Sequence, residues 1–326
     1  MIEFTKVSRD FSGMAENNPL QVYPFRIELE TVGRFRSPEY QGSLFRGGFG
    51  KYFRDLVCIT RAPVCDGCEK LRTCPYLLVF ETPVDPSRFA VLRKYPNAPH
   101  PFVLAPELDG YGDVAPRTRL QLHIALIGPG RDYLPHFLAV FEHMGKAGKF
   151  GGQFRIVRAD SACVKELIFD GAARRLLRDP AEWIWPAAPK PVSQMWIEFL
   201  TPLRMRTGGV YNHHPTFPEI TQTLLRRVHL LRALYGDAVT DTSWTAPLLH
   251  AADAAEVLEK DWRMFEWDRN SGRQGRQVNM DGVLGSIHVK GDLTELARWY
   301  RLGEWVHVGN GTSMGLGRYR LTVESE

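Results

Sequence analysis

Residues 305–323 read WVHVGNGTSMGLGRYRLTV, and the rest of the chain is organised around this stretch. Apolar residues alternate over 305–308 and again over 319–323, which predicts a strand on each side of a loop. Glycine adopts positive φ freely and lets backbone N–H groups approach a ligand closely. The loop glycines are Gly309, Gly311, Gly315 and Gly317.

Polar residues accompany these glycines and suggest what the loop binds. Thr312, Ser313 and Arg318 can donate hydrogen bonds, so the loop is typical of a site for a phosphate backbone. A glycine-rich hairpin without any ligand is the alternative, because glycine loops are weak motifs.

The chain contains this arrangement twice. Residues 145–157 (GKAGKFGGQFRIV) also place a glycine loop before a strand. Gly152-Gln-Phe-Arg-Ile156 matches Gly317-Arg-Tyr-Arg-Leu321 in residue type, and an amphipathic helical pattern precedes both loops. A repeated helix, glycine loop and strand predicts two copies of one small α+β unit.

The composition is that of a globular protein. The 326 residues, 44% apolar and 24% charged, suffice for two domains with cores of their own. A net charge of +4 permits a nucleic acid partner without requiring one. No apolar run reaches the roughly 18–20 residues that span a bilayer, and the N-terminus lacks a signal-peptide core, so we expect a cytoplasmic protein with no membrane partner.

A proline-rich stretch at residues 174–191 predicts the domain boundary. We therefore expect a first domain over 1–190 and a second over 191–326. Within the second, the pattern of residues 251–267 predicts a helix.

The helix predicted at residues 42–57 carries basic residues and glycines together. Arg46, Gly50 and Arg54 recur four residues apart, and glycine inside a helix costs about 1 kcal/mol relative to alanine. The glycines predict close packing against the helix backbone. This fits either tight packing on a sheet or an arginine-lined helix resting on RNA.

Four of the five cysteines lie within residues 58–74, spaced Cys58-x6-Cys65-x2-Cys68-x5-Cys74. A CxxC core between two further cysteines is metal-site spacing, and thiolates suit tetrahedral zinc or, as a weaker alternative, an iron–sulfur cluster. Because all four ligands are cysteine, the predicted site is structural. Two disulfides or free thiols are the other interpretation. Cys163 stands alone in a strand pattern and is predicted to be a core residue.

A second cluster of basic residues lies in the predicted second domain. Guanidinium groups bind phosphates through paired, charge-assisted hydrogen bonds, and this segment has little to bury. The residues predicted to contact RNA here are Arg269, Arg273, Gln274 and Arg276.

Three segments resemble the RAMP-superfamily endoribonucleases that process precursor CRISPR RNA. They are residues 44–76 with 99–104, residues 267–285, and the glycine-rich residues 307–317, the last being the most specific. The resemblance implies tandem ferredoxin-like (RRM-like) domains with a four-cysteine metal-binding insertion in the first. It also implies a precursor RNA repeat or hairpin as substrate and effector-complex subunits as further partners.

The reaction implied by the resemblance needs no catalytic metal. The 2′-hydroxyl of the RNA attacks the adjacent phosphate and leaves a 2′,3′-cyclic phosphate and a 5′-hydroxyl, which requires an acid, a base and cations. No histidine occurs between Met1 and Pro99, although many family members place a catalytic histidine near the first helix. Because it immediately precedes the loop glycines, His307 is the first candidate, followed by Lys51, Tyr52 and Tyr40 on or near the first helix. The missing histidine also favours the alternative of a non-catalytic RNA-binding subunit.

Overall fold

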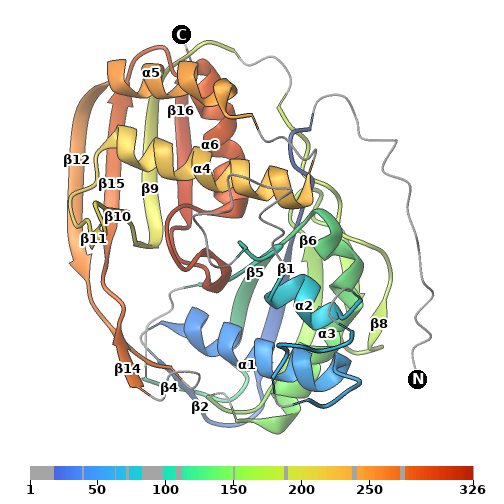
Figure 1. Ribbon diagram of the computed structural model, residues 1–326. Coiled ribbons are helices and arrows are strands. Elements are labelled where there is room, and N and C mark those ends of the chain that lie inside the picture. The colour runs from blue at the N-terminus through green and yellow to red at the C-terminus, as the bar shows by residue number, and fades with distance from the viewer. Residues whose placement is uncertain are drawn as a thin grey trace.

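The computed structural model describes residues 18–38, 40–62, 64–70, 73–82, 98–107, 112–149, 151–186, 190–236, 241–271 and 276–325. The chain forms two α+β units, each an antiparallel sheet with helices packed on one face (Figure 1). In the part of the chain so described, no helix is long and apolar enough to cross a membrane.

The first unit is built on a sheet with the strand order β3-β5-β1-β6-β7-β8. Helix α1 follows the first strand and helix α3 follows the third. The elements are β1 (Val22–Thr31), α1 (Gln41–Val57), α2 (Pro75–Phe80), β3 (Phe102–Pro106), β5 (Arg119–Ile127), α3 (Leu134–Ala147), β6 (Phe154–Ser161), β7 (Leu167–Asp170) and β8 (Arg175–Leu176). A short pair, β2 (Phe35–Ser37) and β4 (Gly112–Val114), lies beside this sheet.

The second unit repeats the plan with the strand order β12-β15-β9-β16. Its elements are β9 (Val192–Leu203), α4 (Phe217–Tyr235), α5 (Ala246–Ala254), β12 (Glu256–Phe265), β15 (Gly282–Lys290), α6 (Thr294–Val306) and β16 (Tyr319–Ser325). Two hairpins are added, β10 (Arg206–Thr207) with β11 (Val210–Tyr211) and β13 (Asp268–Ser271) with β14 (Arg276–Asn279).

Both units have the element order βαββαβ. In each sheet, the first of the four main strands lies between the third and the fourth. This is the ferredoxin-like topology, so the predicted tandem and the predicted internal repeat are confirmed. The two repeated glycine loops precede the equivalent strands β6 and β16.

Aromatic residues at helical spacing explain how α1 is held. Phe45, Phe49 and Phe53 recur every four residues and are fully buried. Phe49 packs on Phe137 of α3 with ring centroids 4.4 Å apart. Gly50 lies on the same helix and faces the ring of Phe80 in α2, where an added Cβ would come within 3.2 Å. The glycine therefore reflects close packing of α2 on α1.

The core of the second unit extends into the first. Val103 and Ala105 of β3 and Ala125 and Ile127 of β5 pack in one cluster with residues of β9, α4 and α6. The second unit therefore packs on β3 and β5 of the first sheet, and this hydrophobic cluster is shared by the two units, whereas the first unit has a second, separate core around α1 and α3.

Three local predictions are wrong. Residues 251–267 were expected to be a helix, but α5 ends at Ala254 and β12 follows, because pairing with β15 outweighs the helical preference of its Glu, Lys and Leu residues. The strand expected at 305–308 is instead the end of α6 and a loop. Cys163 is exposed in the turn between β6 and β7 rather than buried in the core.

Candidate functional site

A cavity of about 200 Å³ lies where the two units meet. Strands β3 and β5 of the first unit form one side, and β9, β16 and the end of α6 form the other. The polar or aromatic side chains that line it are His123, Glu304, Trp305, His307, Arg318, Tyr319 and Arg320. Two residues predicted for the site, His307 and Arg318, are thus brought together.

Two of the lining residues, His123 and Arg318, belong to a cluster of three charged or titratable side chains that Glu107 completes. His123 of β5 places its Nε2 atom 3.0 Å from Oε1 of Glu107. The same nitrogen lies 3.2 Å from Nη2 of Arg318, which comes from the second unit. The side chain of His123 is 22% exposed, so it is accessible from solvent.

The surroundings keep this imidazole neutral and its partner ionised. Burial lowers the pKa of His123 below its ordinary 6.5, and the nearby Arg318 acts in the same direction, against the effect of Glu107. The hydrogen bond from His123 lowers the pKa of Glu107, so this carboxylate is charged at neutral pH. When Nε2–H donates to Glu107, Nδ1 of the neutral ring is unprotonated and can accept a proton. In this tautomer Nε2 cannot also accept from Arg318, whose guanidinium then acts on the ring through its charge rather than through a hydrogen bond.

His307 forms a second wall of the cavity but is far less accessible. It ends α6 with φ of 62°, and its side chain lies against the glycine loop, with Nδ1 3.2 Å from the carbonyl oxygen of Leu316. The residue is only 3% exposed, and burial lowers its pKa well below 6.5. His307 is therefore a neutral, largely enclosed imidazole, and His123 is the better-placed base.

The glycine-rich loop packs against the first unit. All four predicted glycines have positive φ. A Cβ at Gly315 would come within 2.7 Å of Cα of Ala105 in β3, and one at Gly317 within 1.7 Å of the Val308 carbonyl oxygen. The hydroxyl of Tyr40 donates to the carbonyl of Met314 across 2.6 Å. Gly315 is thus required by close packing against the first unit, whereas Gly309, Gly311 and Gly317 are required by close packing within the second unit.

Most backbone amides of this loop already have protein partners. Asn310 N donates to Arg204, Gly315 N to Thr312, and Gly317 N to Pro202. Thr312 is buried and Ser313 is half-buried. These three amides are therefore not available to bind a phosphate, which is the role that the sequence suggested for this loop. Arg318, at the end of the loop, is the residue that reaches the cavity.

The residues predicted on or beside α1 mostly face the protein interior. Tyr40 is 1% exposed and packs on Trp267, and Tyr52 is 8% exposed and packs on His143. Lys51 is exposed. Burial raises the pKa of Tyr40 well above its ordinary value, so its hydroxyl is not a base near neutral pH.

The two arginines of α1 also have partners within the protein. Arg46 places Nη2 2.8 Å from Nε2 of His100 and lies over the ring of Phe80. Arg54 donates to the carbonyl of Ala62 and lies over the ring of Tyr76. These contacts give both arginines structural roles, as the packing interpretation of helix α1 expects.

The predicted basic segment of the second unit forms the β13–β14 hairpin. Arg269 and Arg276 lie on its two strands, while Arg273 and Gln274 fall outside the described residues. The hairpin adjoins the small cluster formed by Tyr40, Trp267, Met280, Met314 and Leu316, which links it to the glycine loop.

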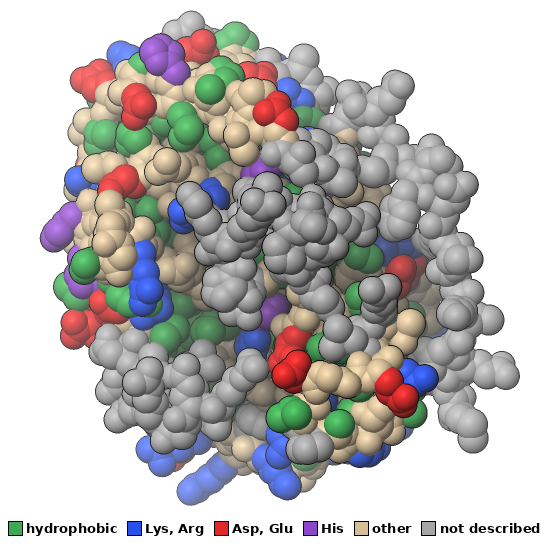
Figure 2. Space-filling view, in the orientation of Figure 1, with side chains coloured by type: hydrophobic (Ala, Val, Ile, Leu, Met, Phe, Trp, Pro, Cys, Tyr) green, Lys and Arg blue, Asp and Glu red, His purple; other side chains and the backbone are tan. Residues whose placement is uncertain are grey.

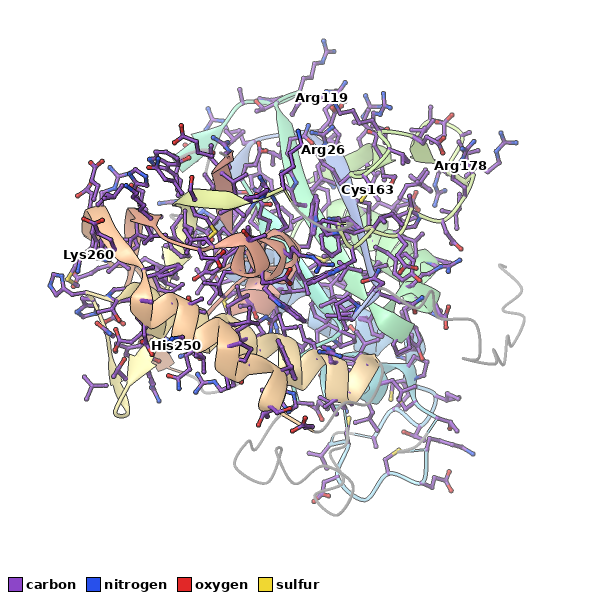
Figure 3. The ribbon with its side chains drawn as sticks, turned by 90° about the horizontal axis from the view of Figure 1, so that it is seen from above. Arg26, Arg119, Cys163, Arg178, His250 and Lys260 are labelled. Carbon is purple, nitrogen blue, oxygen red and sulfur yellow. The ribbon has the colours of Figure 1, made fainter. Side chains whose placement is uncertain are left out.

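The open face of the first sheet continues from the cavity and is rich in arginine. Arg26 of β1 lies directly opposite His123 in the antiparallel register. Arg26 also lines a hollow of about 270 Å³ with the cations Arg158 and Lys165, and with Gln121 and the carboxylates Glu28 and Asp160, the last of which pairs with Arg158. Figure 3 shows Arg26 and Arg119 projecting from the same side of this sheet, away from His250 on α5. Arg119 is paired with Glu28 and Glu30, whereas Arg26 is exposed and has no ion pair among the described residues.

A second basic surface lies at the first unit's outer end. Figure 2 shows Lys and Arg side chains gathered along the lower edge of the molecule, in the region of α1 and the β2–β4 pair. Arg34, Arg36 and Lys51 are the exposed cations of these elements. Both surfaces suit an anionic polymer.

The four predicted metal ligands lie together in the loop between α1 and α2. Cys58, Cys65, Cys68 and Cys74 all line one cavity. All five cysteines are free thiols. Within the described residues, no three His, Cys, Asp or Glu side chains are arranged closely enough to hold a metal ion.

The comparisons with known proteins agree with this architecture. Residues 197–319 match the family model of the CRISPR-associated endoribonuclease Cas6. The C-terminal unit therefore resembles the Cas6 endoribonuclease domain. Residues 20–181 match a second model, described as an N-terminal domain. The resemblance to RAMP-type CRISPR processing endoribonucleases is therefore confirmed.

Similar proteins cover nearly the whole chain. An uncharacterised protein of Archaeoglobus fulgidus is 27% identical over 296 residues, covering 88% of this chain and 93% of that protein. A structure of Cas6 from Thermus thermophilus has a TM-score of 0.52 at 17% identity and covers 93% of this chain and 99% of its own. A Cas6 product complex has a TM-score of 0.55 at 19% identity and covers 93% and 100%. These likenesses show the fold.

His123 and Glu107 were missed from the sequence. The segment Leu120-Gln-Leu-His-Ile alternates, and this pattern places Gln121 and His123 on the open face of a strand. That signal was present, but the pairing with Glu107 and Arg318 depends on how the two units dock.

Proposed function

We propose that the chain is an endoribonuclease that binds CRISPR precursor RNA and cleaves it within each repeat. The observation that supports this most is the cluster of His123, Glu107 and Arg318 at the junction of the units. The Cas6 match over residues 197–319 supports the substrate class.

The cluster contains the groups that cleavage by the RNA's own 2′-hydroxyl requires. The unprotonated Nδ1 of His123 accepts the proton of the 2′-hydroxyl, and the 2′-oxygen attacks the adjacent phosphorus. The bond from phosphorus to the 5′-oxygen breaks, which leaves a 2′,3′-cyclic phosphate. The imidazolium formed at His123 is stabilised by Glu107 and returns its proton to the departing 5′-oxygen.

Arg318 supplies the positive charge that this mechanism needs. A guanidinium remains charged at neutral pH even when burial lowers its pKa, as it does here. Because its Nη2 atom lies 3.2 Å from Nε2 of His123, Arg318 would sit beside a phosphate held against that ring, where negative charge grows in the transition state. Arg26, across the strand pair from His123, would hold a neighbouring phosphate. His307 contributes the wall of the cavity and orients the loop that carries Arg318.

Cleavage of repeat-containing RNA in EDTA tests the proposal. His123→Ala should lower the cleavage rate by about 10²- to 10⁴-fold, the usual cost of losing a general acid–base group, while RNA affinity is retained. His250→Ala changes an exposed histidine of α5 outside the cavity and should cleave like the wild type. A 2′-deoxy substitution at the scissile nucleotide should abolish cleavage because it removes the nucleophile.

A non-catalytic RNA-binding subunit is the second candidate. The burial of Tyr40, Tyr52 and His307 favours it, since three of the four residues first expected to be catalytic are enclosed. If the wild-type protein binds repeat RNA tightly and leaves every repeat intact, the result supports this second function.

A further inference from the structure

The loop from Cys58 to Cys74 is organised around its cysteines although it has no core. None of its described residues is buried. The half-buried ones are the four cysteines and Ala62, while apolar side chains point into solvent: Ile59 is 82% and Val64 is 64% exposed. A segment of this size that buries so little apolar surface cannot offset the entropy of its own ordering, so a cross-link is expected.

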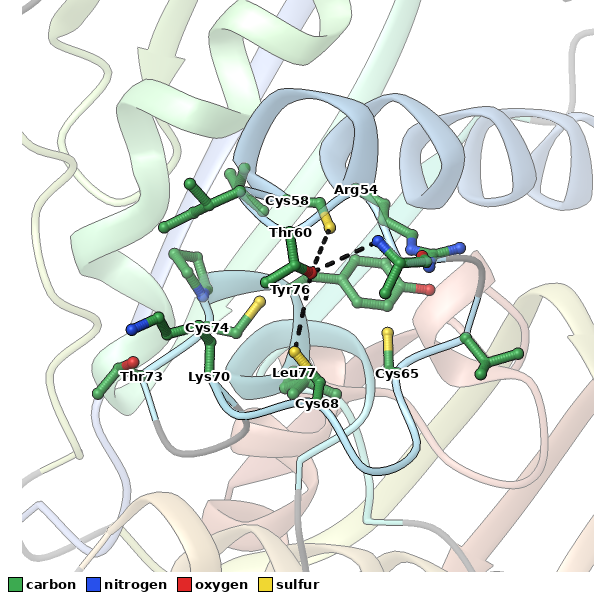
Figure 4. Close-up of a pocket in the computed structure, with 15 residues that line it drawn as sticks. Arg54, Cys58, Thr60, Cys65, Cys68, Lys70, Thr73, Cys74, Tyr76 and Leu77 are labelled. Carbon is green, nitrogen blue, oxygen red and sulfur yellow. Dashed lines mark hydrogen bonds between the residues drawn. The ribbon is translucent and has the colours of Figure 1, made fainter.

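The four thiols surround a single small space. They line a cavity of about 40 Å³ and approach it from four separate points of the loop (Figure 4). The hydroxyl of Thr60 lies 3.8 Å from Sγ of Cys58 and 3.8 Å from Sγ of Cys68, which places it between two of the sulfurs. The remaining two sulfurs, of Cys65 and Cys74, line the same space.

The outer two cysteines are tied to the helices that flank the loop. Cys58 ends α1, with its backbone N–H donating to the carbonyl of Arg54. Cys74 immediately precedes α2. A bond between these two residues would therefore connect the end of α1 to the start of α2.

Helix α2 is a short element that needs such a connection. It has only six residues, too few to be stable alone. Phe80 at its end packs on Phe49 and Phe53 of α1 and on Phe102 of β3. Fixing the start of α2 therefore fixes a part of the first unit's aromatic core.

We propose that Cys58, Cys65, Cys68 and Cys74 bind one zinc ion that joins α1 to α2. Four thiolates satisfy a tetrahedral zinc completely and leave no position for a substrate, so the ion is structural. Binding would draw the sulfurs inward across the small cavity, and the ordering of the loop would be coupled to the ion. This inference is independent of the function proposed above.

Metal analysis of the full-length protein, purified under reducing conditions without added metal, tests the proposal. About one zinc per chain is expected. Cys65→Ser should lose the ion, whereas Cys163→Ser, which changes the exposed cysteine outside the loop, should retain it. Replacement of zinc by cobalt should give the absorption bands of tetrahedral thiolate coordination.

A second measurement does not depend on how the variants fold. Zinc is extracted from the wild type with a thiol-specific mercurial and EDTA, and trypsin is then added. Cleavage at Arg61 and Lys70, both exposed in the loop, should become at least tenfold faster and return to its starting rate when the mercurial is removed and zinc is restored. Four titratable thiols without metal, two disulfides, or an iron–sulfur chromophore would each overturn the assignment to zinc.

Discussion

Replacing Gly315 by alanine tests whether the glycine loop is held by contact between the two units. Gly315 has φ of 90°, a conformation that costs an L-residue about 1–2 kcal/mol. The new Cβ would also lie 2.7 Å from Cα of Ala105 and 2.8 Å from the carbonyl oxygen of Leu104. Ordinary carbon contacts are about 3.5–4.0 Å, and both neighbours are backbone atoms of β3 that cannot rotate away.

The magnitude follows from adding these two effects. Overpacking of this kind costs about 1–3 kcal/mol, so Gly315→Ala should lower the free energy of unfolding by about 2–5 kcal/mol. Gly311→Ala is the matched control, because its φ is 79° and the only close approach of its Cβ would be to Cδ1 of the Leu316 side chain, at 2.7 Å, with no backbone atom in the way. The control should lose about 1–2 kcal/mol from its backbone conformation alone.

Urea denaturation followed by circular dichroism measures both variants. The midpoint of Gly315→Ala should lie clearly below that of Gly311→Ala, with similar slopes. Equal midpoints would refute the reasoning, because the contact with β3 would then contribute nothing to stability.

Three further outcomes are expected. The pKa of His123 is lowered and the base must be unprotonated, so kcat/KM for cleavage should stay constant from neutral pH down to 6.5. It should decline only at pH values below 6.5, and a decline centred above 6.5 would argue against His123. Arg26→Ala should weaken RNA binding and lower the slope of log affinity against log salt by somewhat under one unit, whereas exposed Arg178→Ala should change neither; equal effects would place the RNA elsewhere. Burial lowers the pKa of His100 to about 3, so this ring is a neutral acceptor for Arg46, and Arg46→Ala should cost about 1–3 kcal/mol of stability without weakening RNA binding, which a binding assay beside the melt would check.

The fold was largely predictable because its signals are local. The helical pattern at residues 42–57 appears as α1, and the strand pattern at residues 319–323 appears as β16. The internal repeat then identified two equivalent units. The prediction was wrong at β12. Its residues favour a helix when considered alone, and its pairing with β15, a strand later in the sequence, cannot be inferred from the local pattern.

The site was less predictable, and the reason is geometric. His307 and Arg318 were selected because they flank the glycine loop, and both do line the cavity. The sequence does not show that the hydroxyl of Tyr40 donates to the carbonyl of Met314 in the interior. Nor does it show that His123 lies beside Arg318, 195 positions away in the chain. Such contacts depend on the docking of two units, which no local pattern encodes.

The hydrophobic cluster that the two units share has a consequence for how this chain could be divided. Cutting the polypeptide between Leu176 and Val192 would break none of the strands and helices that the structure describes, yet it would expose the apolar residues of β3 and β5 on one fragment and the surface that covers them on the other. Two such fragments, produced separately, would each lack part of their interior. Co-expressed, they should associate and restore the whole protein, so the covalent link between the halves is less important than the surface at which they meet.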